Sequence, residues 1–220
     1  MNDLLEQIEK LSVDIPDGLM DMMNARGDEV AGHCKRVALM ACILARELGM
    51  PHVEVNAIAQ SGLLHDIGKI VVPRTILVKK ERLTAQEWQV VKSHSLLGYD
   101  ILKPYAGMEK TSEIVYSHHE RFDGTGYPRG LKGADICLEA RMLAVLDTYD
   151  AIRSNRIYDI GRSVERAMRE IAQGRGTQFD PSIVDAFLRC QPCIETCIEE
   201  TKNEGMAGYS ESSSKNSAHA

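Results

Sequence analysis

Histidine and acidic residues occur in pairs along this chain, at spacings that suit metal binding. Glu29 and His33 are four residues apart, so one face of a helix would present both side chains to the same point in space. His65 and Asp66 are adjacent, and adjacent side chains diverge by about 100° on a helix. The second pair can therefore reach two neighbouring ions, and its carboxylate can bridge them through two oxygens.

Three further segments carry the same residue types, namely His94, the pair His118 and His119, and Asp147 on a stripe of small residues. A single histidine in a helix is more often a polar core residue with a hydrogen-bond partner than a ligand. Burying all of these imidazoles without a metal would require many well-placed partners. Their joint occurrence therefore indicates a metal site.

Helical periodicity dominates the segments that carry these residues, and no convincing run of alternating strand residues is present. Thr84 and Glu87 have the spacing of a capping box, and Asp180 with Pro181 provides a helix start. The expected helices, after a short one before residue 25, cover residues 29–48, 53–65, 84–102, 110–120 and 138–153, with two more beginning near Ser163 and Asp180. We expect an all-α, single compact bundle of about seven helices.

Composition and charge exclude several classes of protein. The 220 residues suit one main domain, and a formal charge of −6 provides no basic surface for binding a DNA or RNA duplex. The longest apolar run, residues 37–45, is far shorter than the roughly 20 residues that span a bilayer. The acidic start lacks the basic region of a signal peptide. We therefore expect a cytoplasmic protein without membrane insertion, whose six cysteines are reduced.

The chain divides into three parts on sequence grounds. Residues 1–25 are expected to form a helical extension, residues 26–190 the main domain, and residues 191–220 a C-terminal segment whose serine- and alanine-rich tail after Gly205 is disordered. The cysteines of CQPCIETC, residues 190–197, could serve zinc or redox chemistry. Because a fourth ligand is lacking nearby, an ordinary helix-end segment is favoured, and the role of Cys190, Cys193 and Cys197 stays open.

Two motifs resemble the signatures of a known family. HDIGK at residues 65–69 and DGTGYP at residues 123–128 are similar to the two signatures of the HD-GYP family, a branch of the HD phosphohydrolase superfamily. The similarity runs from about residue 29 to residue 189 and includes LTAQEW, HHERFDG and GTQFDP. The resemblance implies an all-helical HD domain with a Gly/Pro-rich GYP loop that hydrolyses cyclic di-GMP at a site with two or three metal ions.

The resemblance also implies a set of ligands. The positions that match the metal ligands of the family are His33, His65, Asp66, His94, His118, His119 and Asp147. Asp66 would bridge two ions and act in catalysis, and Glu29 matches the carboxylate that holds a third ion in some members. Oxygen and imidazole ligands without thiolate suit iron or manganese, and paired ions suit hydrolysis of a phosphodiester.

Substrate contacts follow from the same resemblance. Lys69 and Arg156 match phosphate-contacting positions, where Lys69 would act in catalysis, although a lysine at a helix end is otherwise simply solvated. Tyr127 could stack or hydrogen-bond, or the GYP loop could be purely structural. Asp159 stands where the family commonly has a basic residue, and its charge would repel phosphate. The affinity for cyclic di-GMP therefore does not follow from the sequence.

Three functions remain open at this point. The first is hydrolysis of cyclic di-GMP to pGpG, and onward to GMP, in bacterial second-messenger signalling. The second is a regulatory module that binds a cyclic dinucleotide with weak turnover, and the third is hydrolysis of another nucleotide. A regulatory protein partner could bind through the GYP loop or the N-terminal helix.

Overall fold

The computed structural model describes residues 6, 8, 10, 11, 15–25, 27–154 and 164–215, without the side chains of residues 28, 29 and 201–215. The helices are α2 (Leu19–Asn24), α3 (Asp28–Glu47), α4 (His52–Leu64), the 3₁₀ helix η1 (Ile67–Val71), α5 (Arg74–Leu77), α6 (Ala85–Lys92), α7 (His94–Leu102), α8 (Glu109–Ser117), the 3₁₀ helix η2 (Gly133–Asp135), α9 (Leu138–Arg153), α10 (Val164–Gln173) and α11 (Pro181–Lys215). Over these residues the only β-type pairing is an isolated bridge between Arg175 and Phe179. The all-helical prediction is confirmed.

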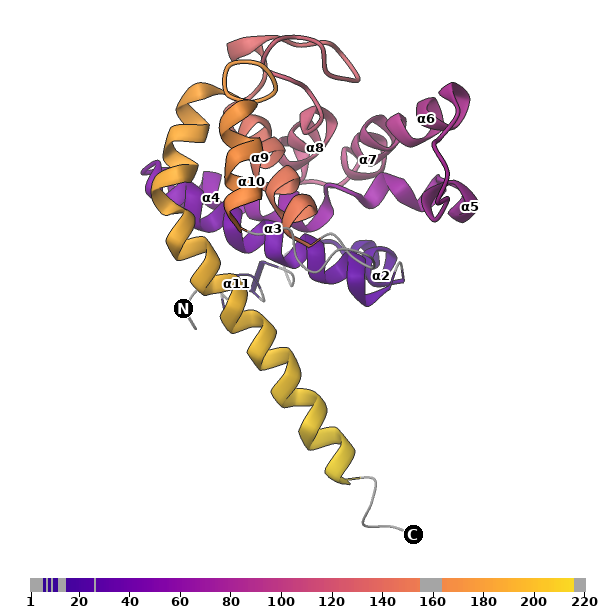
Figure 1. Ribbon diagram of the computed structural model, residues 1–220. Coiled ribbons are helices and arrows are strands. Elements are labelled where there is room, and N and C mark those ends of the chain that lie inside the picture. The colour runs from indigo at the N-terminus through magenta and orange to yellow at the C-terminus, as the bar shows by residue number, and fades with distance from the viewer. Residues whose placement is uncertain are drawn as a thin grey trace.

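Helix α3 runs through the middle of the bundle (Figure 1). Every side chain from Val37 to Ala45 is buried, because α2, α4, α9 and α11 pack around this helix. A helix that is apolar on all sides belongs in a core. His33 therefore lies on the innermost element of the fold. None of the described helices is both long and apolar enough to cross a bilayer.

Two glycines allow unusually close packing around the HDIGK segment. A Cβ atom at Gly62 of α4 would lie 2.7 Å from the Cα of Ala38 on α3, and one at Gly68 of η1 would lie 2.0 Å from the carbonyl oxygen of His94. Neither position can therefore accept a side chain without moving backbone. These contacts hold the segment between α3 and α7.

The helix expected over residues 84–102 is divided in two at Ser93. Its start is as predicted, because Thr84 and Glu87 form the capping box. The hydroxyl of Ser93 donates a hydrogen bond to the carbonyl of Val90 at 2.7 Å, and such local bonds compete with a regular helix. Divisions of this kind, together with the short α5, produce more helices than the expected seven or so. Helices α5 and α6 extend to one side as an arm (Figure 1).

The C-terminal segment expected from residue 191 begins within a longer helix, and its separation from the main domain and its disordered tail stay predictions. Helix α11 runs from Pro181 past Gly205 to Lys215 and leaves the bundle along its length (Figure 1). Its predicted start is confirmed, since Asp180 accepts a hydrogen bond from the backbone N–H of Ser182. A helix that has begun adds one backbone bond for each residue fixed, which lets it continue through polar sequence.

The described N-terminal residues pack onto the bundle. Ile8, Leu11 and Ile15 are buried together with Leu19 and Met23 of α2, so the apolar side of this segment covers the core. The predicted division at residue 25 therefore falls within one continuous apolar core.

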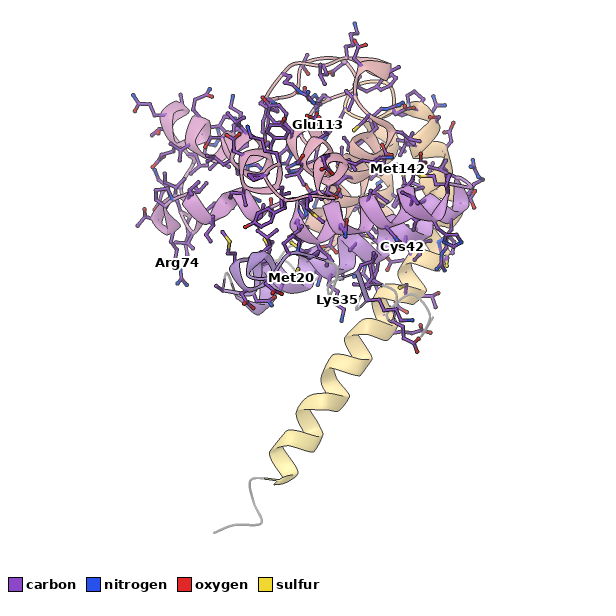
Figure 2. The ribbon with its side chains drawn as sticks, turned by 180° about the vertical axis from the view of Figure 1, so that it is seen from behind. Met20, Lys35, Cys42, Arg74, Glu113 and Met142 are labelled. Carbon is purple, nitrogen blue, oxygen red and sulfur yellow. The ribbon has the colours of Figure 1, made fainter. Side chains whose placement is uncertain are left out.

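A cavity of about 230 Å³ lies beside this N-terminal segment. It is lined by Met20 of α2, by Lys35 of α3 and by neighbouring residues. Figure 2 shows both labelled side chains on the lower side of the bundle, whereas Arg74 points away from the body. None of the predicted metal ligands whose side chains are described lines this cavity.

Candidate metal centre

Seven residues predicted as ligands come from separate parts of the fold and meet at one place. His33 lies on α3 and Asp147 on α9, His94 begins α7, and the other four follow the ends of α4 and α8. They form two groups in which the ligand atoms lie within 4.8 Å of one another, namely His33, His65 and Asp66, and His94, His118 and His119. Asp147 lies beside the first group. Local helix ends thus position most of the candidate ligands.

The first group combines imidazole with carboxylate. The Nε2 atoms of His33 and His65 are 3.3 Å apart. Oδ1 of Asp147 lies 3.2 Å from Nε2 of His33 and 3.8 Å from Nε2 of His65. Two nitrogens and a carboxylate oxygen therefore point at a common centre.

The second group consists of imidazoles alone. The Nε2 atoms of His94 and His118 are 3.3 Å apart. The ring of His119 lies 4.9 Å from that of His94 and 4.0 Å from that of His118, measured between centroids. Three rings share this small volume.

Asp66 lies between the two groups. Its Oδ2 is 3.6 Å from Nε2 of His65 and its Oδ1 is 3.7 Å from Nε2 of His94. Oδ1 is buried and has no hydrogen-bond partner among the described residues, which is costly for a carboxylate oxygen. A carboxylate whose two oxygens face two ligand groups fits a bridge between two cations.

In three histidines a hydrogen bond at Nδ1 fixes the direction in which the lone pair of Nε2 points. Nδ1 of His65, of His94 and of His118 lies 2.9, 2.6 and 2.6 Å from the carbonyl oxygen three residues earlier. A carbonyl only accepts, so each Nδ1 carries the proton and each Nε2 presents a lone pair inward. Two lone pairs facing each other at 3.3 Å repel unless a proton or a cation lies between them. A hydrogen bond from Nδ1 to a backbone carbonyl is a common way for proteins to orient an imidazole that binds a metal through Nε2.

The histidines of the two groups differ in the direction in which their pKa values are shifted. Burial lowers the pKa of His118 well below its usual range and lowers the pKa of His119 to about 4. Burial would also lower the pKa of His33, but Asp147 and Asp150 raise it to about 9. The imidazole group is therefore a set of neutral ligands, whereas the mixed group contains its own balancing charge.

Sequence reasoning missed two residues that orient His33. Nδ1 of His33 lies 2.7 Å from Oδ2 of Asp150, and Arg36 donates to both oxygens of Asp150 at 2.8 and 2.9 Å. Asp150 is fully buried. The available signal was spacing, since Asp150 follows Asp147 by three residues and Arg36 follows His33 by three, which places each pair on one helix face.

Lys69 lies at the edge of the centre. Its Nζ donates to Oδ2 of Asp66 at 2.7 Å, and its side chain is 30% exposed. Burial would lower the pKa of Lys69, but the charge of Asp66 raises it above its ordinary value. A permanent positive charge therefore faces both Asp66 and solvent.

The GYP loop places Tyr127 directly beside the second group. The ring of Tyr127 lies 4.9 Å from that of His119 with 32° between their planes, and its backbone N–H donates to the carbonyl of His119 at 3.2 Å. The buried carboxylate of Glu120 accepts from the backbone N–H groups of Arg129 and Leu131 at 2.6 and 3.1 Å. These bonds give the loop a fixed shape next to the site.

Some predicted site residues are not placed at the centre by the structure. Arg156 and Asp159 lie outside the described residues, as does the side chain of Glu29, whose backbone is in the first turn of α3. On α11, Cys193 is exposed whereas Cys190 and Cys197 are buried. The three thiols on this helix therefore differ in their access to solvent.

Comparison with known proteins places the chain in a family. The profile of the HD domain matches residues 17–183. The chain is 37% identical over 189 residues to a cyclic di-GMP phosphodiesterase of Thermotoga maritima, covering 84% of this chain and 51% of that protein. It is 34% identical over 187 residues to the 3'3'-cGAMP-specific phosphodiesterase 2 of Vibrio cholerae, covering 84% of this chain and 36% of the relative.

A solved structure has the same fold. A cyclic GMP-AMP specific phosphodiesterase of Vibrio cholerae superposes with a TM-score of 0.58 at 20% identity, over 82% of this chain and 46% of that one. The chain spans about half or less of the length of these relatives. The profile covers all the residues that carry the candidate centre, from α3 to α9. The chain therefore belongs to the HD domain family.

Proposed function

We propose that the chain is a metal-dependent phosphodiesterase that hydrolyses cyclic di-GMP to pGpG in bacterial second-messenger signalling. The observation that carries the proposal is the position of Asp66, whose two carboxylate oxygens face two separate groups of inward-pointing imidazole nitrogens. Two adjacent cation sites joined by one carboxylate suit hydrolysis of a phosphodiester. The relative from Thermotoga maritima, named a cyclic di-GMP phosphodiesterase, supports the choice of substrate.

The proposed ligands divide into two sets that share Asp66. His33, His65 and Asp147 would hold one ion, and His94, His118 and His119 the other. Glu29, four residues before His33, would contribute to a third ion. Imidazole and carboxylate donors without thiolate favour iron or manganese. When bound, such ions supply Lewis acidity and lower the pKa of water.

The residues of the chain itself would orient the ligands and bind the substrate. Asp150 and Arg36 fix the ring of His33, and the backbone carbonyls fix His65, His94 and His118. Lys69 would turn its ammonium towards a phosphoryl oxygen of the substrate while it remains close to Asp66. Because Lys69 stays protonated, it would stabilise negative charge as that charge increases on the phosphoryl group. Arg156 would contact phosphate in the same way.

A second candidate substrate is cyclic GMP-AMP. The relative from Vibrio cholerae that is specific for 3'3'-cGAMP matches 84% of this chain at 34% identity. Asp159, where the family commonly has a basic residue, also motivates a third possibility, which is binding of a cyclic dinucleotide with weak turnover. All three proposals use the same centre and differ in substrate or rate.

The test compares nucleotides on one metal-loaded preparation. Protein purified without oxygen and loaded with Fe(II) or Mn(II) is incubated with cyclic di-GMP, 3'3'-cGAMP and cyclic di-AMP, and products are separated by chromatography. We expect pGpG to appear from cyclic di-GMP at the highest rate, and GMP later if hydrolysis continues. Metal-free protein is the control.

Faster turnover of 3'3'-cGAMP would select the second substrate. Calorimetric binding of cyclic di-GMP without product would select the regulatory module. No binding and no turnover of any cyclic dinucleotide would contradict the proposal.

A further inference from the structure

One face of helix α6 carries an indole and an ammonium side by side. Trp88 and Lys92 are four residues apart, so they share a face of the helix. Both contact Tyr127 of the GYP loop. The rings of Trp88 and Tyr127 lie 6.5 Å apart with 76° between their planes, and Nζ of Lys92 lies 5.7 Å from the centroid of Tyr127.

This face is continuous with the metal centre. Tyr127 packs on His119, one of the candidate ligands, at 4.9 Å. Helix α6 is also joined to the centre at its C-terminal end, because the carbonyl of Val91 accepts from Nδ1 of His94. A molecule bound at the centre could therefore extend over Tyr127 onto α6, within the arm that Figure 1 shows beside α7.

The contacts that fix the start of α6 do not involve Trp88. They are its capping box and the bonds from Nζ of Lys79 to both carboxylate oxygens of Glu87 at 2.7 Å. Trp88 is 46% exposed, and leaving apolar surface in water is unfavourable. Its near-perpendicular contact with Tyr127 leaves part of the indole open to solvent. An open aromatic surface next to a cation is what a purine nucleotide requires, since the base stacks and the phosphate is neutralised.

We infer that Trp88 and Lys92, together with Tyr127, form a subsite for one purine nucleotide of the cyclic dinucleotide substrate. The indole stacks on the base. The ammonium of Lys92 faces the second of the two phosphates, the one that is not being cleaved at the metal centre. Lys92 would thereby supply a second positive charge besides that of Lys69. This inference rests on the proposed function and adds the residues that bind the part of the substrate outside the metal centre.

The chain offers a direct optical test, because Trp88 is its single tryptophan. Metal-loaded protein is titrated with a phosphorothioate analogue of cyclic di-GMP, which resists hydrolysis, while the intrinsic fluorescence is recorded. Stacking of guanine on the indole should quench the emission in a saturable way. Emission that stays unchanged while calorimetry shows that the analogue binds would overturn the subsite.

Kinetics of four variants separate binding from chemistry. Stacking of one base contributes enough that Trp88→Ala should raise KM for cyclic di-GMP by about tenfold, with kcat changed by less than about twofold. Trp88→Phe keeps a stacking surface and should raise KM by about threefold at most. Lys92→Met should raise KM and reduce its dependence on salt. The last variant, Tyr127→Ala, should raise KM and change kcat as well, because that ring also packs on His119.

Matched controls come from the same part of the fold. Val90→Ala changes an apolar side chain of α6 that is 38% exposed and lies two residues from both Trp88 and Lys92. Lys103→Met removes another lysine that lies over a tyrosine ring, 5.0 Å from the centroid of Tyr99. Both should leave KM unchanged, and thermal unfolding should show that all variants are folded.

The outcomes distinguish this inference from the function on which it rests. If cyclic di-GMP is hydrolysed while Trp88→Ala and Lys92→Met keep the KM of the unaltered protein, the subsite is wrong and the function stands. If no cyclic dinucleotide is bound or hydrolysed by the unaltered protein, both are wrong. A rise in KM equal in Trp88→Ala and Trp88→Phe would also contradict stacking as the source of the effect.

Discussion

The two halves of the candidate centre reach a similar geometry by different means. In one half His33 lies between Asp147 and Asp150, and these carboxylates raise the pKa of His33 to about 9. In the other half burial lowers the pKa of His118 and His119, and the charges of Asp147 and Asp66 oppose this only in part for His119. The first half is held together by its own ion pairs even without a metal, whereas the second is a cluster of neutral donors.

The difference teaches how charge is distributed at the site. A cation in the imidazole half would receive one formal negative charge, from Asp66, while a cation in the mixed half would receive the charges of Asp66 and Asp147. Ligand charge strengthens the binding of a divalent ion, so the mixed half should bind its ion more tightly. The two carboxylate oxygens of Asp66 face one half each.

Removing Asp66 should have the largest effect, because both halves lose a ligand at once. In Asp66→Ala we expect cyclic di-GMP turnover to fall by more than the roughly 10- to 100-fold that follows loss of an outer-shell partner. Elemental analysis should show less metal retained at both sites. Asp100→Ala, which removes an exposed carboxylate paired with Lys103, is the control and should keep full activity. Full activity in Asp66→Ala would contradict the bridging assignment.

Removing one histidine from each half should separate the two ions. His33→Ala should lose the ion of the mixed half, and His118→Ala should lose the ion of the imidazole half, so each variant retains about one ion fewer per chain. Elemental analysis after gel filtration gives the stoichiometry. His52→Ala removes an exposed histidine at the start of α4 and should bind metal as the unaltered chain does. Unchanged stoichiometry in both variants would show that the halves are not separate sites.

Weakening the support of His33 should have an intermediate effect. Asp150→Asn keeps an oxygen that can accept from Nδ1 of His33 but removes the charge that pairs with Arg36. We expect metal affinity in the mixed half to fall about 10- to 100-fold, as for other outer-shell partners of metal-bound histidines. Competition with a fluorescent chelator measures this affinity. Asp185→Asn, in an exposed pair with Arg175, should leave it unchanged, and equal behaviour of the two variants would contradict the role of Asp150.

Loosening the GYP loop beside the imidazole half should have the smallest effect. The carboxylate of Glu120 accepts from two backbone N–H groups, but the amide of Glu120→Gln has only one oxygen that can accept. The other N–H group would face the amide NH₂ without an acceptor, which should lower the free energy of unfolding by about 1–3 kcal/mol. Denaturant unfolding measures it. Glu113→Gln is the control, because that side chain is 49% exposed and only pairs with Arg129 at the surface. A cost in Glu113→Gln as large as in Glu120→Gln would show that the loop is not held by Glu120.

Much of the fold could be predicted because it depends on local patterns. The capping box at Thr84, the helix start at Pro181 and the bounds of α9 follow from neighbouring residues. The break at Ser93 was missed, since it depends on a side-chain hydrogen bond that competes with the helix over a single turn. The prediction of disorder after Gly205 rests on polar composition, which indicates weak burial and does not exclude helix.

The sequence by itself determined which residue types could act and the order in which they occur, from the pair of His65 and Asp66 to Asp147. It did so because periodicity within one helix fixes which side chains share a face. Tertiary structure alone decided that Asp66 faces both groups, that Asp150 orients His33, and that Tyr127 joins the centre to Trp88. Those contacts join helices far apart in the chain, and the distance between two helices is set by the packing of the whole core, which no local pattern encodes.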